Sequence, residues 1–292
     1  MTRFLCIADT HLGADPMGYT QQRGYPERLR EICRALVERV AAWGGVDFVL
    51  HGGDMVDAGT DANIRAAAGL FDLPAPVYLC LGNHDLTTPD AVERWLELAP
   101  EFFVGDAPEY DVATDDCIVH VCPNHWCETP YFWRDAQDIR FSLDQKERLA
   151  RALDASPDLP HIILTHSPVY GLPPEQTGHR EPLHAPPPEF ASQIAAILAG
   201  HDCVRCVLGG HSHMNMRVNY DGVEFVTVSA LSETPFEIKL FEVSREEMRM
   251  STVSLASSLD FEAEYDEGRG FVQGRAVDRS FTIDVGPGGT SG

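Results

Sequence analysis

The chain has 292 residues, of which 44% are hydrophobic, so it is long enough to bury a large core in one α/β domain. Lysine and arginine number 22 against 45 aspartates and glutamates, which gives a formal net charge of −23. Such an acidic surface repels phosphate backbones and anionic membranes, so nucleic acid and membrane partners are disfavoured.

The first apolar run, residues 4–8, is too short for a signal peptide and ends in a carboxylate at Asp9. No stretch approaches the roughly 18 apolar residues that are needed to cross a bilayer. The eight cysteines lack the spacing of a small secreted disulfide framework. We therefore expect a cytoplasmic protein with reduced thiols.

Short apolar runs alternate with helical patterns as far as residue 213. The predicted strands are 4–8, 48–50, 77–81, 118–121, 161–165 and 204–208. The predicted helices are 26–43, 61–70, 142–153 and 189–199, and Ser142 with Gln145 forms a capping box at the start of the third. Strands that alternate with helices predict an α/β layered fold.

The pattern becomes β-rich after residue 213. A hairpin is predicted from 216–220, the turn Asp221-Gly222 and 223–229, and further strands from 236–243 and 248–255. We assign residues 1–256 to one domain, with 216–256 as its β-rich C-terminal part. Residues 257–292 are acidic and glycine-rich, and we expect them to form a solvated, partly flexible tail.

Seven prolines lie in the segment from Pro168 to Pro188. No regular element is expected there, because proline fixes φ and lacks a backbone N–H. The segment follows a strand that ends in a candidate metal ligand, and a long loop in a compact domain is usually functional or disordered. Its histidines, His179 and His184, lie either over the site or in solvent.

Five of the predicted strands end in polar clusters. The clusters are Asp9-Thr10-His11, His51-Gly52-Gly53-Asp54, Gly82-Asn83-His84-Asp85, His166, and Gly209-Gly210-His211-Ser212-His213. Ligands of α/β sheets bind beyond the carboxyl ends of the strands, so we expect all five clusters to meet at one edge of the sheet. Carboxylate, amide and imidazole groups together suit ions such as Mn, Fe and Zn.

Local geometry supports a shared metal site. Residues i and i+2 of an extended segment face the same way, so Asp9 can face one site with His11, and His211 with His213. The glycines that precede Asp54, Asn83 and His211 let the backbone turn sharply and approach the ions closely. Two ions roughly 3.5–4 Å apart can polarise a phosphoryl oxygen together.

The series of clusters resembles the motifs of the calcineurin-like metallophosphoesterase superfamily. The matching blocks are Asp-x-His, Gly-Asp-x-x-Asp at 53–57, Gly-Asn-His-Asp at 82–85, a lone histidine, and Gly-His-x-His at 210–213. The resemblance extends over residues 4 to about 240. It implies an α/β fold, a four-layer αββα sandwich of two packed mixed sheets flanked by helices. Relatives are often dimers, so the resemblance is compatible with a homodimer, and the sequence leaves the oligomeric state open.

The resemblance also implies a cofactor of two divalent or trivalent transition-metal ions, Mn, Fe or Zn, and a role for each residue. One ion would be held by Asp9, His11 and His213, the other by Asn83, His166 and His211, with Asp54 bridging both. The catalytic residues would be His84, near the leaving-group oxygen, and Asp85, which orients it, with Asp57 behind the ligands. The implied reaction is in-line attack of a metal-bridging hydroxide on phosphorus.

The surroundings of the clusters favour small phosphodiesters such as cyclic nucleotides or glycerophosphodiesters. Ala58 and Asp85 stand where phosphoprotein phosphatases carry Arg and Glu, which disfavours that branch. The helix opening at 141–145 resembles the class III cyclic-nucleotide phosphodiesterases, although Thr165 and Ser167 depart from their His-His-Pro-Pro block.

Charge points the same way. A monoester carries about two charges and a diester one, and no lysine or arginine occurs within the five clusters. The candidates that could still reach in are Arg134, Arg140 and Arg180.

Two alternatives stay open. The opening Ala-Asp-Thr-His-Leu-Gly resembles DNA-repair exonucleases of the same superfamily, but the chain lacks the length and positive charge of their DNA-binding region. The second alternative is a phosphomonoesterase or a non-catalytic binding protein; relatives without activity tend to lose ligands, whereas this chain keeps the whole set.

Other polar and aromatic residues have simpler explanations. His51 is expected to pack rather than bind metal, and Cys206, of the pair Cys203 and Cys206, to be a small core residue. The aromatic stretch at 125–133 either forms a satellite hydrophobic cluster or walls the substrate pocket.

Overall fold

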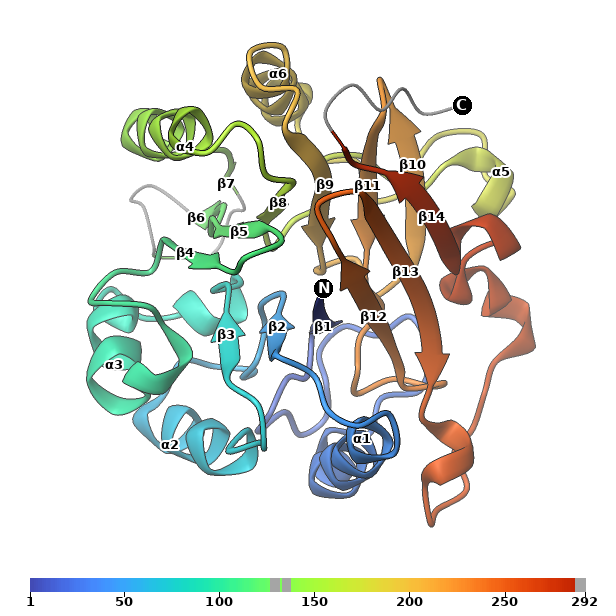
Figure 1. The fold of residues 1–292 in the computed structure, drawn as a ribbon. Helices are drawn as coiled ribbons and strands as arrows, with labels where there is room; N and C mark the ends of the chain where they lie inside the picture. Colours follow the sequence, from blue (N-terminus) through green and yellow to red (C-terminus); the bar gives the residue numbers. More distant parts are fainter. Residues whose placement is uncertain (127–131, 133–137, 287–292) are drawn as a thin grey trace.

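Two six-stranded sheets organise the chain, which the computed structural model describes at residues 1–126, 132 and 138–286 (Figure 1). The first sheet has the order β14 (Ser280–Asp284), β13 (Glu247–Ser254), β12 (Glu237–Val243), β1 (Thr2–Ile7), β2 (Phe48–His51) and β3 (Val77–Leu79). The second has the order β10 (Met216–Tyr220), β11 (Val223–Thr227), β9 (Val204–Gly209), β8 (His161–Leu164), β5 (Ile118–Val121) and β4 (Tyr110–Ala113).

The first sheet is parallel in its N-terminal half and antiparallel in its C-terminal half. Strands β1, β2 and β3 run parallel, and β12 pairs with β1 in the opposite direction. The parallel strands need crossovers, which α1 (Leu29–Ala42) and α2 (Asp61–Leu70) provide, and α3 (Ala91–Leu98) follows β3. Helix α1 buries the apolar face that its spacing predicts, including Ile32 and Leu36.

The second sheet is also mixed. Strands β5, β8, β9 and β11 run parallel, while β4 and β10 close its edges in the antiparallel direction. Helix α4 (Leu143–Ala155) begins at Ser142, and the capping box with Gln145 is confirmed. Helix α6 (Pro188–Leu198) connects β8 to β9, and β6 (His125–Trp126) pairs with β7 (Asp138–Ile139) beside this sheet.

Alternation along the strands shows how the layers pack. In β8, Ile162 and Leu164 join the core shared with β1, whereas Ile163 joins the cluster that contains Leu149 of α4 and Phe190 of α6. The second sheet therefore lies between the first sheet and its own helices. Figure 1 shows α4 and α6 at the top, α1 and α2 at the bottom and the strands between them. The αββα sandwich is confirmed.

Two segments contain more regular structure than the sequence predicted. The proline-rich segment holds α5 (Pro174–Thr177), because proline is tolerated in a first helical turn, and a bridge between Leu172 and Leu183. The segment expected as a tail has 3₁₀ turns at 256–258, 267–273 and 276–278 and then β14, which pairs with β13. Up to residue 286, it is thus part of the first sheet and its border.

Two further findings concern the whole described chain. Across its ranges, each helix is too short or too polar to span a lipid bilayer. The seven cysteines that it includes are free thiols, and Cys206 is fully buried in the core as expected; Cys127 lies outside it.

Candidate metal centre

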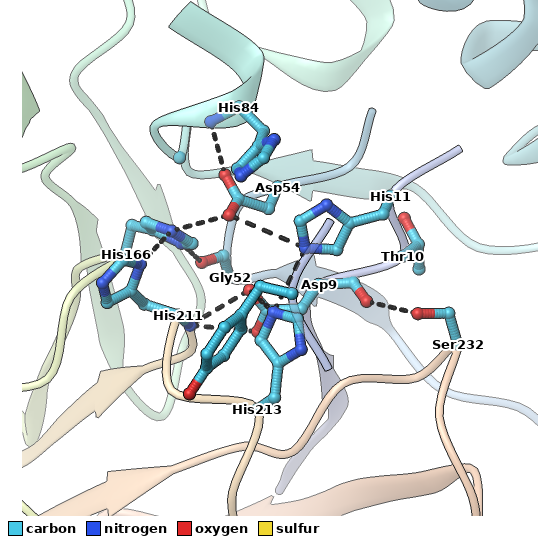
Figure 2. Close-up of polar contacts among 12 residues, drawn as sticks. Asp9, Thr10, His11, Gly52, Asp54, His84, His166, His211, His213 and Ser232 are labelled. Atoms are coloured by element: carbon cyan, nitrogen blue, oxygen red, sulfur yellow. Dashed lines mark hydrogen bonds and ion pairs between the residues drawn. The ribbon is translucent and has the colours of Figure 1, made fainter. Parts of the chain in front are cut away.

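The loops that carry the five polar clusters meet at one place (Figure 2). Three clusters follow β1, β2 and β3 of the first sheet, and two follow β8 and β9 of the second. The expectation of one sheet edge is therefore corrected, because parallel strands of both sheets direct their carboxyl ends to one place. The predicted donors that lie there are Asp9, His11, Asp54, Asn83, His166, His211 and His213.

One group of donors comes from the loops after β1 and β9. The ligand atoms of Asp9, His11 and His213 lie within 4.8 Å of one another, and all three side chains are buried. The Nε2 atoms of His11 and His213 are 3.1 Å apart, and His213 Nε2 lies 3.6 Å from Asp9 Oδ1. Two ring nitrogens that face each other this closely suit a shared cation.

A second group lies beside the first. His166 Nε2 is 3.1 Å from Asn83 Oδ1 and 3.2 Å from His211 Nδ1. Asp54 joins the two groups, since its Oδ2 lies 3.2 Å from His166 Nε2 and 3.8 Å from His11 Nε2. One carboxylate oxygen therefore faces both groups, as Figure 2 shows.

The backbone is strained at this place. Five of the donor residues have φ between 46° and 63°, in the left-handed region that residues other than glycine seldom adopt: Asp9, His11, Asp54, His211 and His213. Each such residue costs on the order of 1 kcal/mol, and such strain collects at functional sites. The concentration of strained donors is an observation independent of their chemistry.

The glycines beside the donors are needed for close approach, as predicted. A Cβ on Gly53, whose φ is +102°, would lie 2.3 Å from His166 Nδ1. A Cβ on Gly82 would lie 2.3 Å from Asp54 Oδ1, and one on Gly210 would lie 2.7 Å from Asp9 Oδ2. A larger residue at any of these positions would displace a donor.

Outer groups fix the rings of three donors. His166 Nδ1 donates to the Gly52 carbonyl at 2.8 Å, and His11 Nδ1 lies 3.3 Å from Asp57 Oδ1. The buried carboxylate of Glu233 lies 2.5 Å from His213 Nδ1, a contact that sequence reasoning missed. Hydrogen bonds to the far nitrogen orient a ligating ring and raise its basicity.

Buried carboxylates of the site raise the pKa values of neighbouring histidines, so ring protons supply positive charge that a metal ion would otherwise supply. Burial lowers histidine pKa values, yet the Asp54 carboxylate raises the pKa of His166 to about 9, and Glu233 raises that of His213 to about 9. Burial would raise the pKa of Asp54, but the rings of His166 and His84 hold it well below its usual value. Metal binding would displace these ring protons, so the donor set fits transition-metal ions.

The two predicted catalytic residues have different surroundings. His84 is partly exposed above Asp54; its backbone N–H donates to Asp54 Oδ1 at 2.8 Å and its Nδ1 donates to the Asp57 carbonyl at 2.9 Å. Asp85 is fully buried and accepts from the N–H groups of Gly82 and Val56. Asp85 therefore holds the loops together, and the Asp57 carbonyl contacts the His84 ring. The role of Asp85 in orienting His84 stays a prediction.

Comparison with known proteins places the chain in a family. The profile of calcineurin-like phosphoesterases matches residues 2–215. The chain belongs to this family. The family consists of metal-dependent phosphoester hydrolases, which fits the clustered histidines and aspartates of this phosphoesterase. No curated protein matches its sequence.

Solved structures share the fold of the phosphoesterase at low sequence identity. It is similar to a dimetal phosphatase of Danio rerio, with a TM-score of 0.67 and 16% identity over 87% of this chain and 96% of that one. It is also similar to a purple acid phosphatase of yellow lupin (Lupinus luteus), with a TM-score of 0.64 and 13% identity over 97% of this chain and 53% of that one. A putative 5′-nucleotidase of Staphylococcus aureus has a TM-score of 0.55 and 11% identity over 93% of this chain and 57% of that one.

Two loops of the phosphoesterase meet above His213. The Tyr19 ring packs edge-on against the His213 ring at 5.4 Å, and the Tyr19 hydroxyl lies 2.7 Å from His184 Nε2. His184 therefore belongs to the exposed rim of the site. His179 and Arg180 are exposed as well. Sequence reasoning missed Tyr19, because an aromatic residue in an irregular loop carries no spacing signal.

Other predicted residues lie apart from the donors or behind them. His51 is buried, with its Nε2 at 3.1 Å from Thr10 Oγ1 and its ring against Phe71, so it packs as expected. Arg140 pairs with Asp138, and Arg134 lies outside the described residues, as do Tyr131 and Trp133 of the aromatic stretch.

Asn124 was also missed, although it holds the His166 loop. Its Oδ1 accepts from the backbone N–H groups of His166 and Ser167 at 3.1 and 2.9 Å. Its neighbour His125 is fully buried beside the rings of His166 and His211.

Proposed function

We propose that the chain is a dinuclear-metal-dependent phosphodiesterase that hydrolyses small phosphodiesters. The observation that carries this proposal is the single oxygen, Asp54 Oδ2, that faces two groups of buried donors at once. A carboxylate that faces both donor groups can hold two ions close together, which suits two-metal hydrolysis.

Each donor has a proposed role. Asp9, His11 and His213 hold the first ion, Asn83, His166 and His211 hold the second, and Asp54 bridges them. Two bound ions supply a nucleophile at neutral pH and polarise the phosphoryl oxygen. The choice among Mn, Fe and Zn follows from affinity and supply, because this donor set accepts all three.

His84 is the proposed proton donor or charge stabiliser at the leaving-group oxygen. Its Nδ1 proton is committed to the Asp57 carbonyl at 2.9 Å, so proton exchange with a substrate is assigned to Nε2. Its backbone contact with Asp54 keeps it beside the bridging carboxylate. Asp85 supports this position through the loops and is a positioning residue.

The charge around the donors supports a diester. In the described ranges, the hydrogen bonds and ion pairs of the seven donor side chains run to histidines, carboxylates, the Asn83 amide and backbone groups rather than to lysine or arginine. A doubly charged monoester would gain from such a cation, whereas a singly charged diester needs it less. The net charge of −23 further disfavours polyanionic nucleic acid as a substrate.

A phosphomonoesterase is the second candidate, because a dimetal phosphatase and a 5′-nucleotidase share the fold. The two candidates are separated by rates on bis-p-nitrophenyl phosphate and p-nitrophenyl phosphate with Mn²⁺. We expect the diester to be hydrolysed faster; a faster monoester rate would favour the second candidate.

The bridging role is tested by Asp54→Ala. Loss of a group that binds both ions should lower kcat/KM for the diester by roughly 10³-fold or more. Asp61→Ala is the matched control, since Asp61 is an exposed partner of Arg94, and its rate should equal that of the unmodified protein. Unchanged turnover in Asp54→Ala would refute the assignment.

A further inference from the structure

His125 is a buried histidine that the family motifs do not assign to the metal centre. It lies in β6, is fully buried, and its ring centroid is 4.4 Å from that of His211 and 5.1 Å from that of His166. Three ring nitrogens, one from each of His125, His166 and His211, lie within 4.8 Å of one another. Three imidazoles therefore converge on the second group of donors.

Both ring nitrogens of His125 lack a hydrogen-bond partner among the residues that the structure describes. An unsatisfied buried polar group costs about 1–3 kcal/mol, so natural proteins rarely keep one without a purpose. The cost falls on a ring whose neighbours are both proposed ligands of one ion. A cation at that place would give the ring the partner that the protein does not provide.

Other buried histidines of this chain show what a purely structural histidine looks like here. His120 lies 2.7 Å from Asp111 Oδ1 and 2.7 Å from the ring of His161. His161 also contacts the Ser156 carbonyl at 2.8 Å, and His51 contacts Thr10. Each has at least one protein partner, and His125 differs from them in this respect.

The backbone fixes His125 in this position. Asn124 binds the N–H groups of His166 and Ser167, which ties the start of β6 to the His166 loop. On its other side, His125 pairs with Ile139 of β7. The ring is thus held beside the second donor group from two directions.

We propose that His125 is a further ligand of the ion at the second position, together with Asn83, His166, His211 and the bridging Asp54. This inference rests on the proposed function, because it assumes that an ion binds there. A third imidazole makes the second position richer in nitrogen than the first, which favours Co²⁺, Ni²⁺ or Zn²⁺ over Mn²⁺ at that position. It also leaves fewer places there for water or substrate.

The experiment measures metal binding directly. Metal-free protein is titrated with Co²⁺ by calorimetry and by visible absorption for the unmodified chain, His125→Phe and the control His120→Phe. We expect two ions per unmodified chain, and in His125→Phe a roughly 10-fold or greater loss of affinity at one position with altered cobalt absorption bands. His120→Phe removes a buried histidine outside the site and should keep both affinities within about 2-fold.

A measurement on the unmodified chain covers the case in which the variant does not fold. Ligating imidazoles in Co²⁺-loaded protein give strongly shifted ring N–H proton signals, and we expect five rather than the four from His11, His213, His166 and His211. Four signals, or unchanged Co²⁺ affinities in a folded His125→Phe, would overturn this inference. The proposed function would still stand if the unmodified chain hydrolysed the diester. An unmodified chain that binds no Co²⁺ would overturn both.

Discussion

The metal centre and a polar cluster near the C-terminus match the negative charge of buried carboxylates in different ways. Both bury carboxylates, and we define the C-terminal polar cluster as Arg217, Glu224, Glu237, Arg275, Asp278 and Arg279. In that cluster each buried carboxylate has an arginine of the chain as its partner. In the metal centre the carboxylates face histidines, and the missing positive charge is left to ions.

Distances in the C-terminal polar cluster show complete pairing. Arg279 lies 2.6 Å from Glu237, Arg275 lies 2.9 Å from Asp278, and Arg217 lies 2.6 Å from Glu224, whose side chain is fully buried. The Arg279–Glu237 pair joins the last segment of the chain to β12, and the Arg217–Glu224 pair joins β10 to β11. Hydrogen bonds of Asp278 and Arg275 with the backbone of Arg217 join the last segment to β10. The difference teaches that a buried charge matched by the protein stabilises the fold, while one left for a ligand makes a site.

Removal of metal is the strongest test of this comparison, because only the metal centre is expected to need ions for its stability. A metal ion at about 1,000 times its Kd stabilises the folded chain by about 4 kcal/mol, or roughly 6 °C in Tm for a chain of this size. We expect EDTA to lower Tm by this amount in calorimetry, and Asp54→Ala to show a smaller response. If neither added metal nor EDTA changed the Tm, the charges of the centre would be balanced by the protein without ions.

Arg279→Ala tests the other region. It leaves the buried Glu237 without its partner and should cost about 3 kcal/mol in the free energy of unfolding, with or without metal. Urea unfolding measures the loss. Arg249→Ala removes an arginine from an exposed pair with Glu247 and should cost less than about 1 kcal/mol. Equal losses in the two variants would show that the C-terminal polar cluster does not depend on burial.

The two regions also differ in how far the sequence predicts them. The donors were predictable because each follows a short apolar strand, and because their types and order form a motif. That both sheets contribute was not predictable from strand spacing alone. Glu233, Asn124 and His125 were not assigned, since each contacts a residue 20 or more positions away in the sequence: His213, His166 and His211, respectively.

The C-terminal segment was expected to be a tail for a related reason. Its acidic, glycine-rich composition is typical of solvated chain, and β14 is only five residues long. Its order depends on arginines that reach carboxylates of other elements, such as Arg279 with Glu237. Pairing of this kind leaves no periodic signal in the sequence.

Lys239 sharpens the comparison, because it is a buried charge that neither an acidic partner nor an ion fully matches. It donates to Thr252 Oγ1 at 3.0 Å, and burial lowers its pKa from 10.5 to about 8, although Glu237 opposes this shift. Between pH 8 and 10.5 the unfolded chain binds more protons than the folded chain, so stability rises with pH in this window.

The size of that rise is on the order of 2 kcal/mol for a fully buried group. Lys239→Met should remove it, so the difference in unfolding free energy between the two chains should shrink as pH rises from 8 to 10.5. Subtracting the chains cancels the titration of the tyrosines and cysteines that they share. A constant difference across the window would mean that Lys239 keeps its charge when folded.

Glu233→Gln should have the smallest effect of these substitutions, and it tests whether the Glu233 carboxylate belongs to the metal centre. Glu233 Oε2 accepts from the N–H groups of Gln21 and Gln22, and Oε1 faces His213 Nδ1, so the substitution keeps the shape and removes the charge. We expect about 10-fold weaker metal binding at the first position, because a carboxylate behind a ligating histidine raises its basicity. Glu237→Gln is the control: it should lower stability and leave metal affinity unchanged, since its charge is matched by Arg279. If both variants weakened metal binding equally, the two regions would not be electrostatically separate. The carboxylates could then not be divided into those matched by metal ions and those matched by arginines of the chain.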